Sequence, residues 1–254
     1  MLKKTFFRTQ TGSNPVAIWQ PAVVAASHSM PAVPVFPETL LLLELEAQER
    51  SADLRRICDV VLSDLGATLQ ILRLAGEEYG DSEDRPHRIE DCIADLGLGR
   101  CLEAVAAQTV NRNANYNDIM EMWAHAREIA RHSKLISEEL SGVNPEEAYL
   151  VGLLHSIGLL PTVLGWDEHE ADAHDTALNG FTMAAQWSLP QFVLDSFNEM
   201  CGVKGASRWN TILKMAHQRA SGSSADCPFQ QEGRPLLYQR FQSDFVVHGG
   251  FAAV

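Results

Sequence analysis

Cysteine pairing is the first feature that this sequence lacks. Five cysteines are scattered along its 254 residues, and no two of them form a C-x-x-C pair. Disulfide frameworks use even sets of cysteines in oxidising compartments, and structural zinc sites use closely spaced pairs. The odd set therefore argues against both. It predicts reduced thiols at Cys58, Cys92, Cys101, Cys201 and Cys227.

Positive charge is also scarce. The chain has 20 Lys and Arg residues against 33 Asp and Glu residues, which gives a formal net charge of −13. Nucleic-acid phosphates and anionic membrane surfaces both attract basic protein faces. The balance therefore argues against nucleic acid and against a membrane as partners. An acidic surface suits a protein partner with a basic face.

No long hydrophobic run of the secretory kind is present. Lys3 and Lys4 are followed by two phenylalanines, but residues 8–14 are polar and Pro21 interrupts the next apolar stretch. A signal peptide needs a continuous apolar segment directly after its basic residues. The sequence therefore predicts no targeting segment and a cytoplasmic location.

Strand patterns, internal repeats and familiar catalytic motifs are missing as well. No run alternates apolar and polar residues with β-branched enrichment, and no repeat of solenoid length occurs. P-loop, G-x-S-x-G and H-E-x-x-H motifs are absent, and residues 97–99 supply too few glycines for a dinucleotide fingerprint. The expected fold is therefore all-α, a multi-helix bundle.

The feature that stands out in this chain is one strongly apolar segment, residues 145–161. Pro145 and the two glutamates after it are typical of a first helical turn, with Asn144 as the cap. Residues 148–160 are apolar nearly all round, which predicts a helix buried on every side. The segment is too short to span a bilayer. One imidazole, His155, lies in the middle of it.

Further helices are expected around this segment. A long helix over 118–140 carries an apolar stripe that continues to Leu135 and Leu140. Ser51 and Asp64 are predicted to cap two earlier helices. The remaining helices are expected over 38–48, 89–96 and 99–110, up to Trp187, after Pro190 and from Ser207 onward.

Composition suggests the domain limits. Residues 1–36 are rich in proline and poor in charge, as is typical of a lead-in or linker. Residues 37–220 contain the helical patterns and are expected to form one helical domain. Glycine, serine and glutamine dilute the pattern over 221–254, which we interpret as a C-terminal tail.

An acidic cluster over 167–175 contains two histidines and has donor atoms that suit a metal ion. Its spacing matches no known oxygen cage, such as the EF-hand loop. Acidic residues ahead of a helix are favoured by the helix dipole. We therefore interpret this cluster as a solvated loop that leads into a helix.

Three other histidines are candidates for a site. His125, His155 and His217 lie on three different expected helices, so packing of those helices can bring the imidazoles into one pocket. The alternative is that each is a separate polar group, satisfied on its own at a helix surface or in the core. The sequence leaves both arrangements open.

Several segments, in their order and separations, resemble the HDOD domain, a sister family of the HD-type metal-dependent phosphohydrolases. The similarity covers residues 35–220, about three quarters of the chain. It implies an all-α bundle and a regulatory or scaffolding role in bacterial signalling. The segments that carry it are residues 37–43, 72–75, 89–98, 147–158 and 187–190.

The resemblance also implies where a metal site would lie. HD enzymes bind metal through an early His, a His-Asp doublet on a buried helix and a late Asp. In this sequence His125 resembles the early His, and His155 resembles the histidine of the doublet. Ser156 stands at the position of the doublet's Asp, and His217 at that of the late Asp. Two divalent cations about 3.5–4 Å apart need bridging anions, which a neutral hydroxyl does not supply. Hard cations such as Mg²⁺ and Mn²⁺ also prefer oxygen ligands.

We therefore expect a non-catalytic regulatory or scaffolding module that binds a signalling protein or a small ligand. No catalytic residue, no cofactor and no metal are expected, and His125, His155, Ser156 and His217 are expected to form a vestigial pocket. One alternative is a nucleotide or cyclic-dinucleotide phosphohydrolase with an altered His site, in which three histidines hold one Zn²⁺. The other is a ligand-binding sensor without turnover. Oligomeric state and ligand-binding residues stay open.

Overall fold

The regular structure of the chain is helical throughout the part that the computed structural model describes, which comprises residues 32–49, 53–80, 82, 84–108, 116–166, 173–202 and 208–222. The predicted all-α fold is confirmed. None of the helices in these ranges is long and apolar enough to cross a membrane. Most of the predicted lead-in, the acidic segment 167–172 and most of the predicted tail lie outside the described residues.

The helices follow the predicted order with small shifts at their ends. They are α1 (Pro37–Gln48), α2 (Leu54–Leu62), α3 (Leu65–Tyr79), α4 (Ile89–Leu96), α5 (Leu98–Ala106), α6 (Tyr116–Glu138), α7 (Pro145–Leu154), the 3₁₀ helix η1 (Ile157–Leu159), α8 (Leu160–Val163), α9 (Ala173–Gln186), α10 (Gln191–Met200) and α11 (Arg208–Gly222).

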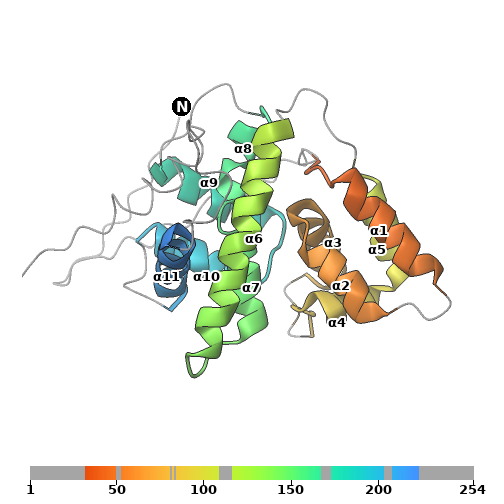
Figure 1. Ribbon diagram of the computed structural model, residues 1–254, viewed down its shortest axis with the longest axis horizontal. Coiled ribbons are helices and arrows are strands. Elements are labelled where there is room, and N and C mark those ends of the chain that lie inside the picture. The colour runs from red at the N-terminus through yellow and green to blue at the C-terminus, as the bar shows by residue number, and fades with distance from the viewer. Residues whose placement is uncertain are drawn as a thin grey trace, which may run out of the picture. The chain divides into compact units, whose positions relative to one another are not determined.

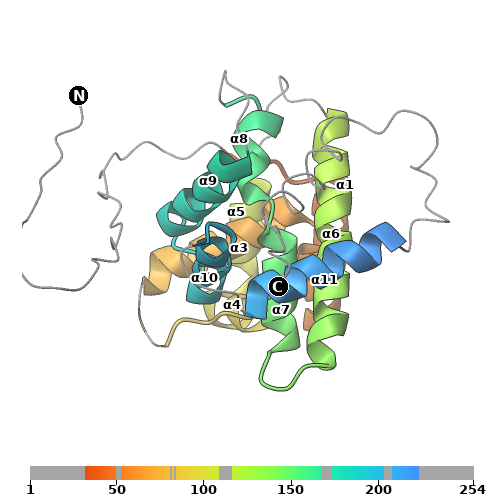
Figure 2. The same cartoon turned by 90° about the vertical axis from the view of Figure 1, so that its left-hand side faces the viewer.

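The long helix α6 lies between two groups of helices (Figure 1). Helices α1 to α5 pack together on one side of it, and α9, α10 and α11 lie on the other. Helix α7 runs beside α6, and α11 crosses both of them (Figure 2). The centre of this arrangement is where α6, the end of α7 and α11 meet, and the candidate histidines lie there.

Close approach of α6 and α7 depends on Gly152. A Cβ added at this position would lie 2.6 Å from the Cα of Ala130 and 2.8 Å from the Oγ of Ser133, both on α6. Such distances are well below van der Waals contact, so only glycine allows the two backbones to pack at this separation. The small residues of α6 at the contact have the same effect from the other side.

The predicted continuous helix over 148–160 is wrong beyond Leu154. His155 and Ser156 form a turn, and η1 and the short α8 follow. Pro161 explains part of the break, because its ring would collide with the carbonyl four residues earlier in an unbroken helix. Gly158 explains the direction of the new path, since a Cβ there would collide with the Thr176 carbonyl of α9. The prediction of burial holds, because residues 148 and 150–160 are all buried.

The predicted stripe on α6 is correct from Ile119 to Ala130 and at Ile136, and it is wrong at Leu135 and Leu140. Leu135 and Leu140 are 44% and 39% exposed, whereas the small polar residues Ser133 and Ser137 are buried. Ala130 and Ser133 are the residues of α6 that contact Gly152, and Leu140 lies beyond the end of the helix at Glu138. The pattern alone did not reveal this, because hydrophobic periodicity carries no information about how closely two backbones approach.

Asp64 joins four separate parts of the chain. Its carboxylate is fully buried and accepts hydrogen bonds from Gly66 N and Ala67 N, which confirms the predicted cap of α3. It also accepts from Phe36 N ahead of α1 at 2.9 Å, from the Thr39 hydroxyl of α1 at 2.8 Å and from the Trp123 indole N–H of α6 at 3.1 Å. A buried carboxylate is tolerated when donors surround it in this way.

The predicted cap at Ser51 lies outside the described residues. Asp53 caps α2 instead, where its carboxylate accepts from Arg55 N at 3.0 Å. Val33 and Val35, ahead of Pro37, are 3% and 1% exposed, so the packed core includes residues of the predicted lead-in. The domain limits themselves stay predictions.

Replacement of Asp64 by asparagine should destabilise the domain by at least about 3 kcal/mol, because an amide presents hydrogens to backbone and side-chain donors that then lose their acceptor. Urea unfolding followed by circular dichroism measures the change. Asp59→Asn, the same substitution at an exposed position of α2, is the control. Equal stabilities for the two variants would contradict the role assigned to Asp64.

Candidate functional site

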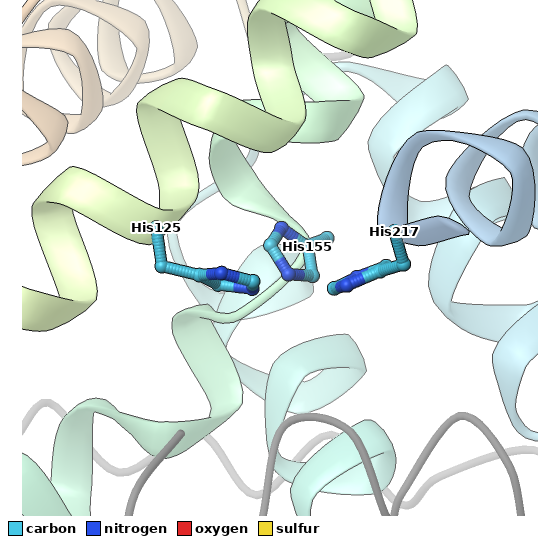
Figure 3. Close-up of side chains that lie close together, drawn as sticks. All are labelled: His125, His155 and His217. Atoms are coloured by element: carbon cyan, nitrogen blue, oxygen red, sulfur yellow. The ribbon is translucent and has the colours of Figure 1, made fainter. Parts of the chain in front are cut away.

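The structure brings His125, His155 and His217 together. His125 comes from the middle of α6, His155 from the turn after α7 and His217 from α11, and the three rings point into one common space (Figure 3). The ring centres lie 5.3 Å apart for His125 and His155, 5.1 Å for His125 and His217, and 5.0 Å for His155 and His217. One nitrogen of each ring lies within 4.8 Å of the others.

His155 is held by the end of its own helix. Its Nδ1 donates a hydrogen bond to the Gly152 carbonyl at 2.7 Å. That carbonyl belongs to the last turn of α7, where the helix supplies no backbone donor. A carbonyl only accepts, so Nδ1 carries the proton and the neutral ring has its lone pair on Nε2.

His217 is positioned by the start of α11. Glu199 of α10 is 6% exposed, and its carboxylate accepts from the backbone N–H of Asn210 at 3.0 Å. A carboxylate at a helix N-terminus is favoured by unsatisfied backbone donors and by the helix dipole. This bond fixes the first turn of α11 against α10, and His217 lies two turns farther along.

Burial keeps all three imidazoles neutral at physiological pH. It lowers the pKa of His125 to about 3 and that of His155 to about 4, and it lowers the pKa of His217 as well. For His125 and His217 the neighbouring imidazoles lower the pKa further, because a positive charge on either ring would be repelled by a positive charge on the others. Neutral imidazoles offer lone pairs, which metal ligation needs.

Ser156 is the fourth residue of the predicted pocket. It is 2% exposed, and within the described residues its hydroxyl has no hydrogen-bond partner. The cluster of metal-ligating groups contains three histidines and, within the same residues, no carboxylate. The side chains of the acidic segment 167–175 lie outside the described part of the chain.

This donor set limits the chemistry of the pocket. Three nitrogens suit borderline ions such as Zn²⁺, whereas Mg²⁺ and Mn²⁺ prefer oxygen. Two ions bridged by a carboxylate, as in two-metal phosphoester hydrolysis, need a ligand that this cluster does not supply.

Sequence reasoning missed two residues that shape the site. Gly152 both admits α6 and accepts from His155, and Glu199 anchors the helix that carries His217. The signal for the first was an isolated glycine three residues before a histidine in an apolar helix. Nothing in the sequence marked the second, because a carboxylate that caps a neighbouring helix follows no local pattern.

The family model of the HDOD domain matches residues 33–172, more than half of the chain. This chain belongs to the HDOD domain family. The resemblance found in its sequence is therefore confirmed.

Two of the solved structures that match share the fold. The MmoQ response regulator of Methylococcus capsulatus is 18% identical, with a TM-score of 0.62, and the match covers 85% of this chain and 94% of that one. A 20–298 fragment of the same regulator gives 18% identity and a TM-score of 0.60 over 84% and 91% of the two chains. A Campylobacter jejuni virulence factor is 19% identical, with a TM-score of 0.49 over 74% and 75%. None of the functionally curated proteins matches this sequence.

As the pH is lowered, the free energy of unfolding should begin to decrease before the carboxylates become protonated. The unfolded chain binds protons on its histidines with a pKa of about 6.5, while the folded pocket keeps His125 and His155 neutral down to about pH 3–4. Each such histidine should therefore lower the free energy of unfolding by about 1.4 kcal/mol per pH unit as pH falls below 6.5. Urea unfolding at pH 7.5, 6.0 and 5.0 measures the slope. His125→Gln should make it shallower, and an unchanged slope in this variant would contradict the buried, neutral state.

Proposed function

We propose that this HDOD domain protein is a non-catalytic regulatory or scaffolding module of bacterial signal transduction, located in the cytoplasm. Family membership and the fold shared with a protein described as a response regulator support a signalling role. The single observation that carries the non-catalytic part is the composition of the pocket, which contains three histidines and, within the described residues, no carboxylate.

The reason is electrostatic. A phosphoester hydrolase of the two-metal type holds two cations close together, and anionic ligands offset their repulsion. Here the position expected for the doublet's acid is Ser156, and the late acid is replaced by His217. Neutral imidazoles and a neutral hydroxyl supply no such charge, so recognition is better supported than hydrolysis.

A surface of α1 supports a protein partner. Leu41, Leu42 and Leu45 are 57%, 48% and 54% exposed and are neighbours on one face of the helix. Glu38 and Glu44 are exposed on the same helix. An apolar face next to acidic side chains suits a partner segment that combines apolar and basic residues.

The purified full-length protein should hydrolyse neither nucleotides nor cyclic mono- and dinucleotides above a metal-only blank, because the pocket lacks bridging anions. Product release in the presence of Mg²⁺, Mn²⁺ or Zn²⁺ checks this. Turnover that disappears in His155→Gln would favour the alternative function, a phosphohydrolase with an altered His site.

The double variant Leu41→Ser/Leu45→Ser should lose a protein partner that the wild type retains, because the anchoring apolar contacts of an interface carry most of its affinity. Cross-linking in the native cells, followed by purification, checks this. Leu135→Ser is the matched control, because Leu135 is also an exposed leucine, at 44%, and lies on α6.

Identical captured proteins from the wild type and both variants would contradict the α1 surface. In a parallel thermal-shift screen, a nucleotide that raises the melting temperature without turnover would instead favour the ligand-binding sensor.

A further inference from the structure

We propose that His125, His155 and His217 bind a single transition-metal ion of the Zn²⁺ class, and that the site discriminates against Mg²⁺ and Mn²⁺. Because Ser156 and His217 stand where HD enzymes have acids, the sequence leads to the expectation of no metal in this pocket. The placement of the three rings leads to a different conclusion. The inference goes beyond the proposed function, which requires no metal.

Ring separation is the first argument. Zn–N bonds of about 2.0–2.1 Å at tetrahedral angles place the centres of three ligating imidazoles roughly 5 Å apart. The three centres of this cluster are separated by 5.3, 5.1 and 5.0 Å. Three helices from distant parts of the sequence therefore hold the imidazoles at the spacing of one tetrahedral ion. Independent packing of three polar side chains gives no reason for equal separations.

Ring orientation is the second argument. The candidate ligand atoms lie within 4.8 Å of one another, against about 3.3 Å expected around a tetrahedral zinc. Rotation of the rings about χ2 changes this distance without moving the ring centres far, and terminal torsions of this kind are soft. Rotation of the His125 and His217 rings alone leaves the bond from His155 to Gly152 O in place.

His155 already has the outer contact of a metal ligand. Histidines that bind metals usually donate their second ring N–H to a carbonyl or carboxylate, which fixes the ring and its tautomer. The Nδ1–H of His155 donates to Gly152 O in this way. Its Nε2 therefore has the lone pair, and Figure 3 shows the ring facing the same space as those of His125 and His217.

The donor set decides the class of ion. Three imidazoles and, among the described residues, no acidic ligand favour a borderline ion over a hard one. Three protein ligands leave a fourth tetrahedral position for water or an added ligand. The ligands belong to α6, to the turn that ends α7 and to α11. A bound ion would therefore hold these three segments together.

The full-length protein, stripped with chelator and then dialysed against Zn²⁺, should retain one ion per chain by elemental analysis. Ligand loss in His217→Gln should weaken Zn²⁺ binding by more than the 10–100-fold typical of an outer-contact change. His132→Gln should leave binding unchanged, because His132 is also a buried histidine of α6 but lies outside the cluster. Zn²⁺ at about 100 times its dissociation constant should raise the wild-type melting temperature by roughly 5–10 °C.

Cobalt provides a readout that a purely structural role of His217 would not change. Co²⁺-loaded wild type should show the strong visible bands of a tetrahedral ion. Co²⁺-loaded His217→Gln should show weakened and shifted bands, because one imidazole is missing from the ion's coordination sphere. Circular dichroism without metal establishes that each variant is folded.

Several results would overturn the inference. They are a wild type that retains no stoichiometric Zn²⁺ or Co²⁺, equal loss in His132→Gln and His217→Gln, a folded Co²⁺-loaded His217→Gln with unchanged cobalt bands, and equal retention of Mn²⁺. The proposed function fails separately. A bound ion without phosphoester turnover supports both proposals, whereas a bound ion with turnover supports only the metal site.

Discussion

The contact between α6 and α7 at Gly152 is the constraint on which the rest of the site depends. A side chain at this position would enter the backbone of α6, so the absence of a Cβ sets the separation of the two helices. The same residue supplies the carbonyl that holds the ring of His155. Helix packing and histidine orientation therefore share one cause, and His125 faces His155 because the backbones that carry them run so close.

The electrostatic character of the pocket follows from that packing. Burial keeps the imidazoles of His125 and His155 uncharged, and the buried hydroxyl of Ser156 is neutral as well. Within the described residues the cluster therefore offers nitrogen donors and no carboxylate.

The helices were predictable from the sequence because their signals are local, whereas the convergence of the three histidines was left open. Asn144, Pro145 and Asp64 mark helix starts through their own chemistry, and the confirmed cap at Asp64 shows how reliable such signals are. The end of α7 was not readable, because Pro161 and Gly158 act through neighbours in space. An apolar run looks the same whether it forms one helix or a helix, a turn and a second short helix.

Partners distant in sequence were also beyond prediction. The sequence suggested Asp64 as a cap, but nothing indicated that Phe36, Thr39 and Trp123 would donate to the same carboxylate. The predicted burial of Leu135 was wrong, because the buried face of α6 passes through Ser133, Ile136 and Ser137 instead. Tertiary packing decided each of these positions, and single-sequence patterns do not record it.

The hydrogen bond from Phe36 N to Asp64 has a consequence for where this domain begins as a folding unit. A protein shortened to start at Pro37 would keep every helix and still lose two buried valines and one of the five donors around the carboxylate. Water would have to enter beside Trp123 to replace them. The short extended stretch ahead of α1 is therefore part of the core. Its loss would weaken the packing of α3 and α6, which lie far along the chain.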